Sequence, residues 1–146
     1  MTLPALTISG DLPVGAHPTT LTEVLEVFAN STLQRRQVGA RLKRLYELVA
    51  STGGVKRFVV FGSFITRKPD PNDIDVFLVM HNEFDIGALT GEARLAFDHA
   101  IAQAHFGVSV FWLRQLAALP DEEHAIANWA IKRDGSVRGL VEIIGV

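Results

Sequence analysis

Apolar residues recur along this chain in two patterns, one typical of buried strands and one typical of amphipathic helices. A continuous β-branched and aromatic run at residues 58–61 predicts a strand covered on both faces, and residues 74–80, 108–113 and 137–144 predict three further strands. Apolar positions at helical spacing predict helices over residues 21–29, 31–53, 90–105 and 121–133. Because both kinds of element mix along one continuous pattern, we expect an α+β domain with a small mixed sheet of three to five strands packed with helices.

Glycine and proline set the first twenty residues apart from the rest. Their recurrence between Pro4 and Pro18 predicts an irregular N-terminal lead-in over residues 1–20. The remaining residues, 21–146, are expected to form a single domain, which suits a chain of 146 residues and 16.0 kDa.

Charge is distributed unevenly along the chain. The formal net charge of −2 combines balances of −3 over residues 1–30, +8 over 31–69 and −7 over 70–146. The total argues against a general polyanion binder, but it leaves room for one anionic ligand at a local site. Cysteine is absent, which excludes disulfides and thiolate metal sites. No secretory signal or membrane span is apparent, so a cytoplasmic location is expected.

The stretch between the first two predicted strands carries the strongest chemical signal. A buried strand ends at Phe61 and is followed by Gly62 and Ser63, which allow a sharp turn. If a short helix follows, its free amides and the Ser63 hydroxyl suit a phosphate group. Asp73 and Asp75 stand at positions i and i+2, so on a strand their carboxylates share one face. Such a pair favours a bridging divalent cation, most plausibly Mg²⁺.

Each part of this pattern has a simpler interpretation by itself. Gly-Ser alone is a turn, and an Asp-x-Asp pair at the start of a strand is often solvated. The combination of buried strand, Gly-Ser, a nine-residue spacer and Asp-Ile-Asp before an apolar strand is much more specific.

That combination, Phe61-Gly62-Ser63 followed by Asp73-Ile74-Asp75-Val76, resembles the signature of the nucleotidyltransferase superfamily whose palm is shared with DNA polymerase β. The short chain is similar to the minimal nucleotidyltransferases of bacteria and archaea, and most of it resembles one bacterial branch of unknown function. The resemblance implies a polymerase β palm-like fold.

The resemblance also implies a set of roles. Gly62 and Ser63 would bind the phosphates of an NTP, and the catalytic carboxylates Asp73 and Asp75 would hold Mg²⁺. A nucleotidyl group would pass to a hydroxyl on a protein, an RNA or a small molecule, with release of pyrophosphate. Arg67 and Lys68, in the spacer, would neutralise phosphate charge or form part of a solvated loop.

One position departs from the superfamily pattern. Active members carry a third carboxylate on a neighbouring strand, where this chain has Ser109. A serine is a poor base and a poor metal ligand. The alternative function is therefore a catalytically impaired nucleotide-binding or interaction protein, such as the antitoxin-like half of a bacterial two-component system with a helical protein partner.

The remaining candidates are weaker. His99 and His105 lie six residues apart on a predicted helix, which separates their directions and argues against a metal pair. Trp112 and Trp129 lie within apolar patterns, so they are interpreted as core residues or, alternatively, as a surface on which adenine could stack.

Overall fold

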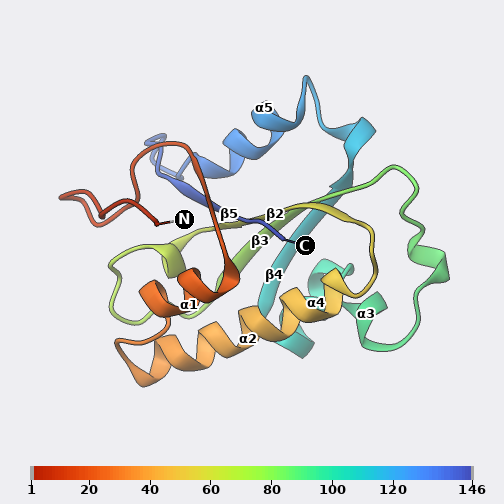
Figure 1. Ribbon diagram of the computed structural model, residues 1–146, viewed down its shortest axis with the longest axis horizontal. Coiled ribbons are helices and arrows are strands. Elements are labelled where there is room, and N and C mark those ends of the chain that lie inside the picture. The colour runs from red at the N-terminus through yellow and green to blue at the C-terminus, as the bar shows by residue number, and fades with distance from the viewer. Residues whose placement is uncertain (1, 146) are drawn as a thin grey trace.

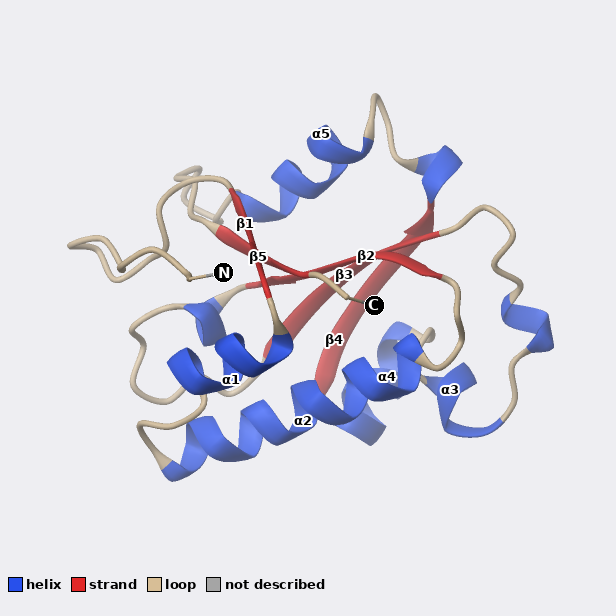
Figure 2. Cartoon of the chain, in the orientation of Figure 1, coloured by secondary structure: helices blue, strands red, loops and turns tan. Residues whose placement is uncertain are grey.

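A five-stranded mixed sheet forms the centre of the computed structural model, which describes residues 2–145 (Figures 1 and 2). Its strands are β1 (Ala16–Thr19), β2 (Val55–Phe61), β3 (Ile74–Met80), β4 (Val108–Arg114) and β5 (Leu140–Ile143), in the spatial order β1-β5-β2-β3-β4. Strand β2 is antiparallel to β3 and β5, whereas β1 and β5, and also β3 and β4, are parallel. The expected α+β class and mixed sheet are confirmed.

Helices cover the two faces of the sheet unequally. The described residues form α1 (Leu21–Phe28), α2 (Leu33–Ala50), α3 (Gly91–Leu95), α4 (His99–Phe106) and α5 (Glu122–Ala127). In Figure 1, α1 to α4 lie on one side of the sheet and α5 lies on the other. Within residues 2–145, no helix is long and apolar enough to cross a membrane.

Side chains alternate along β3 between two apolar clusters. Ile74, Val76, Leu78 and Met80 belong to the larger cluster, which includes the buried stripe of α2. Phe77 and Val79 face the opposite side, where Ile126 and Trp129 pack. By the same alternation Asp75 points to the α5 side of the sheet. On β4, Ser109 and Phe111 share that side.

The lead-in, expected to be irregular, contributes the edge strand β1. The amide of Leu140 donates to the carbonyl of Gly15 and the amide of Gly139 donates to that of Leu12, so backbone pairing with β5 orders this segment. Proline and glycine hid it from periodicity, because a four-residue strand containing Pro18 shows no alternating run.

The helix expected over residues 90–105 is interrupted between α3 and α4. The carbonyl of Phe97 accepts a hydrogen bond from the indole of Trp112 at 2.8 Å. The chain then restarts at Asp98, whose side chain caps α4 by accepting from the amide of Ile101 at 3.1 Å. A tertiary contact with β4 therefore lies in the turn after α3, and an N-cap begins the next helix.

The helix expected over residues 121–133 is also shorter than expected. It ends at Ala127 and a 3₁₀ turn follows over Asn128–Ala130. Ile131 then forms an isolated β-bridge with Val137, which holds residues 131–133 in a turn instead of a last helical turn.

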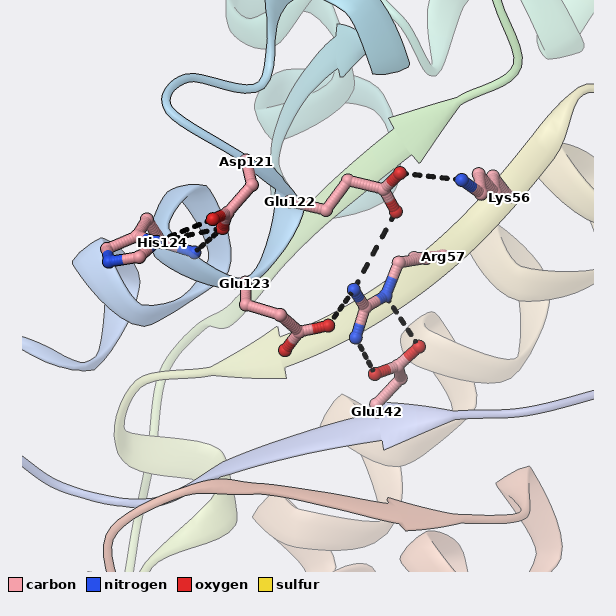
Figure 3. A network of polar contacts seen from close by, with 7 residues as sticks. All are labelled: Lys56, Arg57, Asp121, Glu122, Glu123, His124 and Glu142. Carbon is pink, nitrogen blue, oxygen red and sulfur yellow. Dashed lines mark hydrogen bonds and ion pairs between the residues drawn. The ribbon is translucent and has the colours of Figure 1, made fainter.

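Ion pairs attach α5 to the sheet (Figure 3). The guanidinium group of Arg57 on β2 donates two hydrogen bonds to Glu142 on β5, at 2.6 and 3.0 Å, and also pairs with Glu122 and Glu123. Lys56 contacts Glu122 at 2.6 Å. The hydrogen bonds to Glu142 are the main reason that the pKa of Arg57 is raised. This network lies on the α5 face at the end of β2 remote from Gly62.

Candidate functional site

Four strand ends meet at one edge of the sheet. The C-terminal end of β2 and the N-terminal ends of β3, β4 and β5 converge there because β2 runs antiparallel to β3 and β5 while β4 follows β3. Asp75 pairs with Phe61 on one side and with Ser109 on the other. Asp73 immediately precedes β3. The structure thus brings the Gly-Ser turn and both aspartates to the same edge.

Gly62 brings the turn against the Asp75 carboxylate. Its φ of 87° lies in the left-handed region that favours glycine, and a Cβ at this position would overlap the Asp75 carboxylate oxygen Oδ2. A short 3₁₀ helix, Ser63–Ile65, follows. The Ser63 carbonyl accepts from the amide and the hydroxyl of Thr66, at 3.2 and 2.6 Å. Glycine is required here by both conformation and space.

Asp75 has a strongly perturbed electrostatic environment. Burial, and secondarily the charge of Asp73, raise its pKa to about 6, while Arg138 and His99 act in the opposite direction. Both carboxyl groups are half-buried. Two neighbouring carboxylates with partial burial are destabilised as anions, so a cation placed between them would relieve the repulsion.

A basic pocket of about 310 Å³ adjoins the turn. Its cationic residues are Arg67, Lys68, Lys132 and Arg138, and it is completed by Ser9, Gly10, Asp11, Ser63 and Thr66. Arg138 lies 3.9 Å from Asp11, which leaves an excess of positive charge. Asp73 and Asp75 do not line the pocket, but Arg138 acts on Asp75 and Ser63 follows Gly62, so the two features are adjacent. An anionic ligand in the pocket would lie next to the carboxylates.

A buried arginine holds the spacer between the turn and the aspartates. Arg35 on α2 is only 4% exposed. Its guanidinium group donates to the carbonyls of Phe28 and Phe64, at 3.0 and 2.7 Å, and to those of Thr66 and Lys68. Burial lowers the pKa of Arg35, and Asp70 opposes that effect. The carbonyl groups that follow Ser63 are thereby fixed relative to α2.

Two further side chains of α2 hold the end of the same spacer. Gln34 donates to the carbonyl of Pro71 at 3.0 Å, and Arg41 donates to that of Asn72 at 3.4 Å. The face of α2 that carries these residues therefore positions Asp73 through the backbone that precedes it.

Ser109 occupies the place beside Asp75 at which a third carboxylate was expected. It is 6% exposed, and its hydroxyl accepts a hydrogen bond from Gln103 at 3.4 Å. Within residues 2–145, no three His, Asp or Glu side chains gather closely enough to hold a metal ion. The residues present fit Mg²⁺ only as a two-carboxylate site, in which water and ligand oxygens would complete the coordination.

Sequence reasoning missed four residues of this region. Lys132 and Arg138 lie about seventy residues beyond Ser63, and only the return of β5 beside β2 brings them to the pocket. Arg35 belongs to the basic segment of residues 31–69, and no local pattern marks it as buried. His99 points away from His105, which contacts Glu92 at 2.9 Å. Instead, the charge of His99 acts on Asp75. The number of basic residues could have drawn attention to Lys132 and Arg138, but it could not have shown where they lie in the fold.

Comparison with known protein families gives a match over nearly the whole chain. The model of a family of unknown function, DUF6932, matches residues 4–144. No curated protein and no solved structure matches the chain. Because the match spans nearly the whole length and includes the lead-in, the turn, both aspartates and the basic pocket, the chain belongs to the DUF6932 family.

Proposed function

We propose that this protein binds a nucleoside triphosphate with Mg²⁺ and transfers a nucleotidyl group to a hydroxyl acceptor. The observation that supports this most strongly is the adjacency of the Gly62–Asp75 contact to a pocket with four cationic side chains. Phosphates need positive charge and amide or hydroxyl donors, whereas a divalent cation needs the carboxylates. A triphosphate with its metal is a ligand that uses both features together.

Each residue has a definite role in this proposal. Ser63 and the pocket cations Arg67, Lys68, Lys132 and Arg138 bind the β- and γ-phosphates. Asp73 and Asp75 would hold the metal. Magnesium, when bound, supplies charge neutralisation of the phosphate oxygens. The acceptor oxygen bonds to the α-phosphorus, the bond from that phosphorus to the bridging oxygen of the β-phosphate breaks, and pyrophosphate leaves.

Ser109 favours a second candidate function. Because its hydroxyl stands opposite Asp75 in place of an acid, the protein would bind nucleotide without transferring it. In that case it would act as a nucleotide-binding or antitoxin-like interaction protein, with a small helical protein as its partner. In the first proposal, by contrast, a protein, an RNA or a small molecule accepts the nucleotidyl group.

Label transfer separates the two proposals. The protein is incubated with each of the four α-labelled NTPs and Mg²⁺, with a candidate partner or RNA present, and Asp73→Asn is compared with wild type. Glu83→Gln, an exposed carboxylate outside the site, is the matched control. Transfer that is abolished by Asp73→Asn and retained by Glu83→Gln supports the enzyme. Nucleotide binding that depends on Asp73, without transfer, supports the second candidate, and absence of Asp73-dependent binding refutes both.

A further inference from the structure

His99 lies on the β4 flank of the site. It is the first residue of α4, it is exposed, and its ring packs on Phe111 with the centroids 4.6 Å apart and an interplanar angle of 34°. Phe111 is on the same face of β4 as Ser109, the cross-strand neighbour of Asp75. The imidazole therefore shares the α5 side of the sheet with the Asp75 carboxylate.

One hydrogen bond determines which ring nitrogen of His99 carries the proton. Nδ1 lies 3.2 Å from the backbone carbonyl oxygen of Val110. A carbonyl oxygen can only accept, so Nδ1 is the donor. In the neutral ring Nε2 then keeps its lone pair, which makes it available as a proton acceptor. The contact with Phe111 limits rotation of the ring.

Two basic groups, Arg138 and His99, lie on opposite sides of Asp75 in the sheet. Arg138 precedes β5 and His99 adjoins β4, while Asp75 lies on β3 between those strands. Both groups act on Asp75, since each lowers its pKa. The basic pocket thus marks the side for the phosphates, and the imidazole, which contacts Val110 and Phe111, marks the opposite side.

We infer that His99 Nε2 is the proton acceptor for the attacking hydroxyl, in the place where Ser109 offers no base. This inference rests on the proposed function. The hydroxyl proton passes to Nε2 as its oxygen bonds to the α-phosphorus. The electron pair of the broken phosphorus–oxygen bond leaves with pyrophosphate, and the imidazolium returns its proton to solvent. No oxidant or reductant is involved.

His99→Asn tests the assignment, because its side-chain amide retains a donor for the Val110 carbonyl and lacks a base. His105→Gln, on the same helix beside Glu92, is the matched control. The assay measures release of nucleoside monophosphate and pyrophosphate from Mg²⁺ and each α-labelled NTP, with water and glycerol as acceptors. We expect His99→Asn to lower turnover at least about 100-fold, with nucleotide affinity unchanged within about threefold. His105→Gln should match wild type.

Nitrogen-15 NMR gives a readout independent of turnover. Long-range proton–nitrogen correlation should show the His99 signal, assigned by its loss in His99→Asn, as the Nδ1–H tautomer. The opposite tautomer, equal turnover in His99→Asn and wild type, or a wild type that binds NTP and releases no pyrophosphate overturns the assignment. Failure of wild type to bind any NTP overturns the proposed function as well, so the two failures are distinguishable.

Discussion

At the level of single residues, the ionised carboxylate of Asp75 destabilises the folded protein. Its half-buried carboxyl group lies against Gly62 and near Asp73, and its pKa is raised to about 6. The folded protein therefore binds this proton more tightly than the unfolded chain does. The contribution of Asp75 to stability therefore falls as pH rises from about 4 to about 6, and the full penalty from this group remains above that range. A group that destabilises its own fold in this way is typical of a functional site.

Replacing this carboxyl group should stabilise the protein. We expect Asp75→Asn to raise the free energy of unfolding at pH 7.5 by about 1–2 kcal/mol without divalent cations, after allowance for partial exposure. At pH 4 the difference should be much smaller, because the folded protein then holds the proton and the unfolded chain, with an ordinary pKa of 3.8, holds it in part. Urea denaturation at the two pH values measures this, with Glu83→Gln as the exposed control. A lower stability of Asp75→Asn at pH 7.5 would contradict the account.

Spacing identified Gly62, Ser63, Asp73 and Asp75 because they lie close together along the chain, and the structure brings them to one edge. The same reasoning failed for Lys132 and Arg138, whose approach depends on strand order. It also failed for Arg35, because a helix pattern cannot distinguish a cation in solvent from one that is buried against carbonyl groups.

At the scale of elements, α2 acts as the support for the turn and the spacer. Arg35→Met leaves buried carbonyl groups without donors, so we expect a loss of about 2–4 kcal/mol in the free energy of unfolding. Arg36→Met, the exposed neighbour, should change it by less than about 0.5 kcal/mol. Equal urea midpoints for the two variants would refute the supporting role of Arg35.

The attachment of α5 gives a second prediction at this scale. Glu142 is 18% exposed and pairs bidentately with Arg57, whereas Glu123 is 72% exposed. Glu142→Gln should lower stability by about 1–2 kcal/mol, and Glu123→Gln by less than about 0.5 kcal/mol. Thermal unfolding monitored by circular dichroism compares them. Equal effects would show that burial does not determine the contribution of each pair.

Element prediction succeeded where apolar runs were continuous, as in β3, or strictly periodic, as in α2. It failed where distant contacts determine the ends of elements. The Trp112 indole binds the turn that separates α3 from α4, and pairing with β5 orders β1. Neither contact leaves a local pattern that periodicity can detect.

At the scale of the whole molecule, the near-neutral total charge conceals a localised basic site. The cationic side chains of the pocket belong to the spacer and to the turn before β5, and the strand order brings these two segments together. The α+β class with a mixed sheet followed from the alternation of elements, whereas the strand order did not, because periodicity carries no information on pairing.

Calorimetric titration with Mg²⁺–NTP measures whether the basic pocket and the carboxylates bind one ligand together. Wild type, Asp75→Asn and Lys132→Ala are compared, with Arg133→Ala as the control, since Arg133 adjoins Lys132 but does not line the pocket. We expect wild type and Arg133→Ala to bind at least one NTP, and the affinity of the other two variants to be at least about tenfold weaker, which corresponds to about 1.4 kcal/mol. Absence of binding by wild type, or equal affinity in all four proteins, would contradict this expectation.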